Sequence, residues 1–172
     1  MRPGLKLAGV FAVCAAPFAL GWLAYEYGWF SGQPSNYGEL IKPRPIDGAL
    51  AALRGKWVLL TADAAACSAA CERKLYIVRQ VRKAQGKDAE RIERLWVVTD
   101  AGKPRAELAA ALEGAHVATP SAPFLQSLPG APLEHIYLVD PLGNLMMRFP
   151  AEADPAKMIK DLERLLKYSS FG

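Results

Sequence analysis

Two cysteines that lie four residues apart are the most reactive groups of this sequence. The stretch CSAAC places Cys67 and Cys71 directly after an apolar run and at the expected start of a helix. Free N–H groups at a helix N-terminus favour the thiolate, so Cys67 is placed to react with a disulfide or to bind a soft metal. Three interpretations are open here: a redox pair, a metal site, or two small apolar residues that fill a core beside several alanines.

The four-residue spacing bears on the first two interpretations. Side chains at positions i and i+4 of a helix have Cβ atoms roughly 5–6 Å apart, whereas a disulfide prefers about 3.8 Å. The spacing therefore favours a chelating pair over a disulfide, unless the first cysteine lies in the loop before the helix. Cu(I) accepts thiolate ligands readily, and a nearby imidazole would complete a three-coordinate site. Zinc would require a fourth ligand, which no obvious residue supplies.

Two histidines are available as a third ligand. His116 lies in an irregular stretch, where we expect a solvated surface residue. His135 directly precedes a predicted strand, residues 136–139. With regular strand alternation, His135 shares a face of that strand with Tyr137 and Val139. A polar residue that caps the entrance of the strand is the alternative to a ligand at this position.

Other positions offer little chemistry. Asp63 and Asp100 follow predicted strand ends, where we expect loop solvation and helix capping. The charged stretches 87–94 and 160–167 are predicted to be solvated helix or loop faces. The chain has no GxSxG, P-loop, HExxH or GxGxxG motif.

The hydrophobic pattern predicts the elements that must position the cysteines. Continuous apolar runs predict buried strands, and apolar residues at helical spacing predict amphipathic helices. In the helix that contains Cys71, basic residues are expected on the surface: Arg73, Lys74, Arg79 and Arg82. The predicted strands are 57–61, 95–99, 136–139 and 145–149, and the predicted helices are 69–83, a helix that begins near Pro104 and a last helix that begins at Pro155. The order β-α-β-α-β-β-α implies a three-layer α/β domain with parallel crossovers and a final antiparallel hairpin.

The N-terminus carries a candidate membrane anchor. Residues 7–25 are nineteen residues without a charge, preceded by Arg2 and Lys6. At 1.5 Å per residue this run spans about 28 Å, close to the hydrocarbon thickness of a bilayer. Aromatic residues at its far end suit an interfacial belt, and the basic residues before it predict a cytoplasmic N-terminus. We expect a retained single-pass anchor over residues 1–30, and a cleaved signal peptide is the alternative.

The rest of the chain is expected across the membrane. Residues 31–55 contain three prolines and four glycines and predict an extended tether, and residues 56–172 are the predicted globular domain. The formal net charge of +4 is too small and scattered to indicate a nucleic-acid partner. An exported domain meets oxidising conditions. There, Cys67 and Cys71 form one close pair, and a wider disulfide framework is excluded.

With these features the chain resembles the Sco/SenC-type thioredoxin-like proteins of cytochrome c oxidase assembly. The similar motifs are GKWVLLT (55–61), the CxxxC, and IYLVDPLGN (136–144), after an anchor and a tether. The stretches 36–45 and 71–87 are similar to a small proteobacterial branch of membrane-anchored, Sco-like proteins. The resemblance implies a thioredoxin-like fold in the periplasm on the inner membrane. It also implies copper bound by both cysteines and a histidine, and delivery of that copper to the oxidase, or reduction of the oxidase's own cysteines.

Two positions depart from the Sco pattern. Ser68 and Ala69 stand where the family usually has proline and an acidic residue, and His135 lies closer to the last hairpin than the family's histidine does. The leading hypothesis is copper handling by Cys67 and Cys71 with His135 as a third ligand. The second is a thiol–disulfide oxidoreductase in which Cys67 attacks and Cys71 resolves. The third is a non-catalytic assembly protein that docks on an oxidase subunit or on other assembly factors.

Overall fold

The computed structural model describes residues 3–29, 35–46, 50–119 and 121–171. The chain forms two compact units, Met1–Ser35 and Asn36–Gly172. The first contains helix α1 (Pro3–Glu26), in which the stretch Ala8–Glu26 is long and apolar enough to cross a membrane. This stretch coincides, within one residue at each end, with the uncharged run of residues 7–25.

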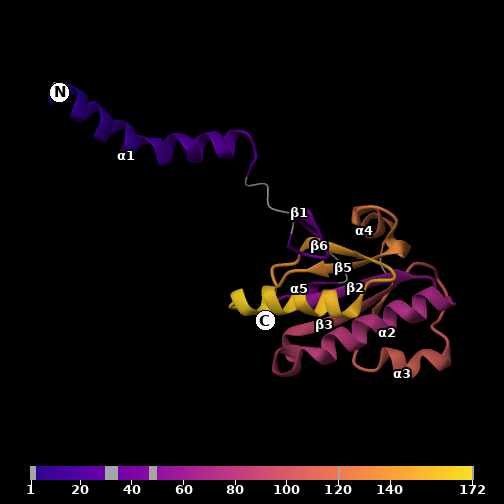
Figure 1. Ribbon diagram of the computed structural model, residues 1–172. Coiled ribbons are helices and arrows are strands. Elements are labelled where there is room, and N and C mark those ends of the chain that lie inside the picture. The colour runs from indigo at the N-terminus through magenta and orange to yellow at the C-terminus, as the bar shows by residue number, and fades with distance from the viewer. Residues whose placement is uncertain (1–2, 30–34, 47–49, 120, 172) are drawn as a thin grey trace. The chain divides into compact units, whose positions relative to one another are not determined.

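A six-stranded mixed sheet organises the second unit (Figure 1). The strand order is β1-β6-β5-β2-β3-β4. Strands β2, β3 and β4 are parallel, whereas β5 is antiparallel to β2 and β6, and β1 is antiparallel to β6. The strands are β1 (Glu39–Pro45), β2 (Trp57–Asp63), β3 (Ile92–Val98), β4 (His116–Ala118), β5 (His135–Val139) and β6 (Asn144–Pro150). The parallel crossovers and the closing hairpin are as predicted.

Helical segments pack on both faces of the sheet. They are η1 (Ala51–Leu53), α2 (Ala69–Ala84), η2 (Gly86–Arg91), η3 (Ala106–Leu108), α3 (Ala109–Leu112), α4 (Ala122–Ser127), η4 (Pro132–Glu134) and α5 (Pro155–Tyr168). On one face, α2 and α5 pack against Leu59, Ile136 and Leu138. On the other, η1 and α4 pack against a core that includes Leu60 and Tyr137. Neighbouring residues of a strand thus contact opposite layers, which confirms the three-layer α/β prediction.

Local sequence explains where the two long helices of this unit begin and end. The Ser68 hydroxyl accepts a hydrogen bond from Cys71 N at 3.4 Å, which caps α2. Gly86 follows the end of α2 with a φ of +56°, a left-handed conformation that favours glycine. The Asp154 carboxylate accepts a hydrogen bond from Ala156 N at 2.9 Å and caps α5, which begins at Pro155 as predicted.

Two segments contain more structure than predicted. Strand β1 lies within the predicted tether and pairs with β6, so the compact unit begins at Asn36. The apolar pattern of this strand is weak because most of its side chains are exposed. The irregular stretch predicted around His116 contains β4, and α4 follows it and buries Phe124. These elements are too short to show a period in sequence.

Two basic residues predicted on the surface are buried. Lys74 is 0% exposed and Arg94 is 4% exposed. Arg94 lies in β3, which begins at Ile92 and therefore three residues before the predicted strand. Lys74 lies in the same helix as Cys71, and Arg94 lines a pocket near the C-terminal end of that helix.

Candidate functional site

Cys67 and Cys71 form a disulfide at the junction of β2 and α2, with Cα atoms 5.2 Å apart. Cys71 is the third residue of α2, whereas Cys67 lies before the helix with a φ of +43°. In the part of the chain that the structure describes, Cys67 is the only non-glycine residue with a positive φ. The preference for a chelating pair assumed that both cysteines lie in regular helix. Because Cys67 does not, the spacing permits the disulfide.

The disulfide is shielded from solvent. Cys67 is 3% exposed and Cys71 is 1% exposed, and both belong to an apolar cluster with Leu75, Trp96 and Leu108. A second thiol or a metal ion can therefore reach the sulfur atoms only after the residues that cover them move.

The loop after β3 holds this segment in place. Asp100 Oδ1 accepts hydrogen bonds from Ala65 N and from Gly102 N, both at 3.1 Å. A Cβ atom at Gly102 would lie 2.7 Å from the Cβ of Ala65, so the two loops are in close contact at this point. Asp100 was predicted to be a solvated or helix-capping residue. It is exposed, as a solvated residue should be, and its carboxylate also joins two loops at the carboxyl ends of neighbouring parallel strands.

Arg105 is a site residue that sequence analysis missed. Its Nη2 donates to Cys67 O at 2.8 Å and to Glu72 Oε1 at 2.5 Å. The guanidinium thus joins the backbone of the first cysteine to the first turn of α2. The rule that polar residues gather at the carboxyl ends of parallel strands could have identified it, since Arg105 follows β3 as Cys67 follows β2.

Lys74 connects α2 to two other elements. Its Nζ is 2.8 Å from Asp63 Oδ2, at the end of β2, and donates to Leu133 O in η4 at 2.6 Å. Asp63 is 7% exposed, so the prediction that it is a solvated loop residue was wrong. Burial raises the pKa of the Asp63 carboxyl, and the Lys74 ammonium acts against this shift. The ion pair joins the cysteine helix to the end of β2, and the hydrogen bond to Leu133 O joins it to η4, which precedes His135.

His135 lies at the start of β5 on the face predicted for it. Its ring centroid is 5.9 Å from that of Tyr137, and Nδ1 is 2.9 Å from Ala131 O. Tyr137 belongs to the core on the sheet face opposite α2, so the His135 ring is directed to that side. Within the described residues, no three His, Cys, Asp or Glu side chains gather as a metal site. His116 lies in β4 with its side chain 52% exposed, a surface position as predicted.

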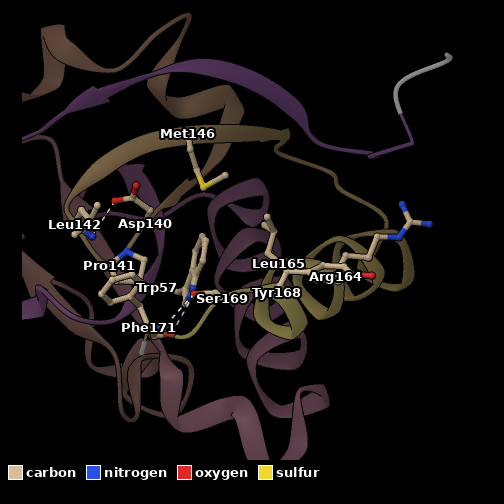
Figure 2. Close-up of a pocket in the computed structure, with 10 residues that line it drawn as sticks. All are labelled: Trp57, Asp140, Pro141, Leu142, Met146, Arg164, Leu165, Tyr168, Ser169 and Phe171. Carbon is tan, nitrogen blue, oxygen red and sulfur yellow. Dashed lines mark hydrogen bonds between the residues drawn. The ribbon is translucent and has the colours of Figure 1, made fainter. Parts of the chain in front are cut away.

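An apolar pocket lies at the far end of β2 from the cysteines (Figure 2). Its volume is about 450 Å³, and Trp57, the first residue of β2, forms part of its wall. The β5–β6 turn and the C-terminal part of α5 complete the pocket, with Leu142 and Leu165 among the residues drawn in Figure 2. Since β2 has seven residues, its two ends are about 20 Å apart. This pocket is therefore separate from the cysteine site.

Comparison with known families identifies the domain. The sequence model of the family described as transmembrane-like, thioredoxin-like, C-terminal domain matches residues 57–169. The chain belongs to this family. No protein of curated function matches the chain by sequence. The family match covers β2, the cysteine pair and everything up to the end of α5.

Solved structures of Sco proteins share the fold of this transmembrane-like, thioredoxin-like protein. Apo Sco1 from Thermus thermophilus matches with a TM-score of 0.58 at 20% identity, covering 78% of this chain and 99% of that chain. Copper-bound ScoI from Bradyrhizobium japonicum matches with a TM-score of 0.52 at 21% identity, covering 74% and 98%. BsSco, a Sco-family cytochrome c oxidase assembly protein with a disulfide switch, matches with a TM-score of 0.51 at 16% identity, covering 80% and 98%. At these identities the likeness concerns the fold, and the thioredoxin-like prediction is confirmed.

Proposed function

We propose that this protein is a membrane-anchored, periplasmic factor for cytochrome c oxidase assembly that handles copper as a cargo through Cys67 and Cys71. The observation that carries the proposal is the cysteine pair at the β2–α2 junction of a fold shared with Sco proteins. One of those proteins has been solved with copper bound. The helix Ala8–Glu26 would hold the domain at the inner membrane.

Copper binding requires the reduced pair. An external dithiol, which is itself oxidised to a disulfide, would supply the two electrons and two protons that convert the Cys67–Cys71 disulfide to two thiols, and both thiols lose their protons when they ligate Cu(I). Because Cys67 lies outside the helix, its side chain can turn relative to Cys71 once the disulfide is open. His135 is the proposed third ligand. The η4–β5 segment would have to bring its ring toward the cysteines, since the ring is directed to the other face of the sheet.

Thiol–disulfide exchange is the second candidate function, and the disulfide itself favours it. In this reaction the Cys67 thiolate attacks a client disulfide, forms a mixed disulfide and releases one client thiolate. The Cys71 thiolate then attacks the Cys67 sulfur, which releases the second client thiol and restores the Cys67–Cys71 bond. Such a step would reduce the copper-binding cysteines of the oxidase.

Copper titration separates these functions. Residues 31–172 are reduced and titrated with Cu(I) against a competing chelator, and the titration is repeated with His135→Ala and, as a matched control, His116→Ala. One-to-one binding that weakens only in His135→Ala supports the copper site with its third ligand. Absence of binding, together with reduction of a client disulfide by the dithiol, would refute copper handling in favour of exchange. If Cys67→Ala/Cys71→Ala still supported oxidase maturation in cells, both functions would fail and a docking role would remain.

A further inference from the structure

A second pocket, lined mainly by basic side chains, lies near the C-terminal end of α2. It has a volume of about 300 Å³. Its lining residues are Arg79, Arg82, Lys83, Arg94, Glu113 and Gly114. Four cations thus share one small cavity with a single carboxylate. The three residues from α2 have the spacing i, i+3 and i+4, which places them on one face of the helix.

Stability of the helix does not explain this arrangement. Like charges at these spacings destabilise a helix by a few tenths of a kcal/mol per pair. The helix dipole favours Arg82 and Lys83 because they are in the last turn of α2, but Arg79 lies before that turn. The fourth cation, Arg94, comes from β3 and not from α2.

Arg94 gives the pocket a buried positive charge. The residue is 4% exposed, its Nη1 donates to Ala111 O at 3.1 Å, and its Nη2 donates to Glu113 O. These acceptors are main-chain carbonyls at the end of α3, so they satisfy the N–H groups without neutralising the charge. Burial lowers the pKa of Arg94, and the charges of Arg82 and Arg79 lower it further.

The carboxylate in the pocket is a weak counter-ion. Glu113 Oε2 lies 3.2 Å from Arg79 Nη2, but the Glu113 side chain is 77% exposed. An exposed ion pair contributes at most about 1 kcal/mol. Arg82 is directed by the bond from its Nε to Ile92 O at 2.6 Å. Arg82 and Arg94 are thus held in place by main-chain contacts, and the single carboxylate among the lining residues does not balance the four positive charges.

We propose that this pocket binds a phosphate group. Planar guanidinium groups match the oxygens of phosphate with paired hydrogen bonds, and three arginines line the cavity. The group could come from inorganic phosphate or from the headgroup of an anionic phospholipid, which a membrane anchor would keep close to the domain. Arg79 follows Cys71 by eight residues, about 12 Å along α2, so the site is separate from the cysteines and does not depend on the proposed function.

Ligand titration by NMR tests the proposal on the full chain in neutral detergent. Inorganic phosphate is added in one arm and dihexanoyl phosphatidylglycerol in the other, while the amide signals of Arg94 and Gly114 are followed. Dihexanoyl phosphatidylcholine is the lipid control. A saturable shift with phosphate identifies a free anion as the ligand, and a saturable shift with phosphatidylglycerol alone identifies the headgroup. Absence of a saturable shift in both arms overturns the proposal.

Two variants with opposite expected effects on phosphate affinity distinguish a loss of the binding site from a general effect on folding. Arg79→Gln/Lys83→Gln is expected to weaken binding about tenfold or more, because it removes two charged donors at the rim. Glu113→Gln is expected to tighten binding, because it removes the competing carboxylate. Arg73→Gln is the matched control, since Arg73 forms an exposed ion pair with Glu152 elsewhere on α2. Weaker binding in Glu113→Gln, or equal losses in Arg73→Gln, would also overturn the phosphate site.

Discussion

Replacement of Lys74 by methionine leaves an unbranched side chain one atom shorter and removes its charge from the interior. In the native protein, Nζ lies 2.8 Å from Asp63 Oδ2 and donates to Leu133 O. Lys74 is 0% exposed and Asp63 is 7% exposed, so water cannot replace the lost partner easily. Removal of one member of a buried pair typically costs about 3–5 kcal/mol of unfolding free energy.

Proton uptake by Asp63 limits this cost and makes it depend on pH. Without Lys74, the buried carboxyl escapes an unpaired charge by binding a proton, which costs about 1.4 kcal/mol for each pH unit above its ordinary pKa of about 3.9. The loss of unfolding free energy in Lys74→Met is then at most about 4 kcal/mol at pH 7 and about 1.5 kcal/mol at pH 5. The sign follows from linkage. The folded pKa is raised, so the native variant binds the extra proton and loses stability as pH rises from below the unfolded pKa.

Urea unfolding of residues 36–172 at pH 5, 6 and 7 measures this dependence. The double variant Asp63→Asn/Lys74→Met removes both charges, so we expect it to be more stable than Lys74→Met at pH 7 and nearly independent of pH. Lys87→Met, at an exposed position, is the control for loss of a lysine. A loss in Lys74→Met that is equal at pH 5 and pH 7, or a double variant less stable than the single one, would refute the reasoning.

Three further changes have defined outcomes. Arg105→Gln removes the charged donor to Cys67 O; dithiothreitol should reduce its disulfide about tenfold faster, measured by thiol release, and an unchanged rate would contradict a holding role. Gly102→Ala places a methyl group 2.7 Å from the Ala65 Cβ, so a lower Tm by calorimetry and faster reduction are expected together. Tyr137→Phe removes a buried hydroxyl that donates to a main-chain carbonyl at 2.8 Å and should cost about 1 kcal/mol in urea unfolding. Because burial raises the pKa of Tyr137 to about 12, its phenolate absorbance should appear only above the range of the exposed tyrosines.

Most of the fold follows from hydrophobic patterning. Strand β2 is buried along its whole length, and a strand covered on both faces has a continuous apolar sequence. The helix α5 was predicted from apolar residues at helical spacing and from Pro155 at its start, both of which depend only on local sequence. Strand β1 was missed because it lies at an edge of the sheet, where pairing with β6 and not its own pattern defines it.

The location of the cysteine site in the fold was predicted from the sequence, but the residues that contact it from other elements were not. The Cys67–Cys71 pair and the face of His135 follow from spacing and alternation along one segment. The contacts of Arg105 and Lys74 depend on how loops from different strands meet, which no local pattern encodes. The burial of Lys74 could not be predicted from its residue type, because α2 carries several other lysine and arginine residues and their side chains are partly or fully exposed.

The two edges of the sheet restrict how a client can approach the domain. At one edge, β1 contains Pro43 and Pro45, which lack an N–H group, and its register with β6 shifts between Leu40 and Arg44. At the other, β4 is only three residues long. Prolines, irregular pairing and short strands all discourage a further strand from joining a sheet. An extended peptide segment therefore gains little by joining the sheet as an added strand, and under the proposed function a client would instead contact side chains on the loops and helices around Cys67.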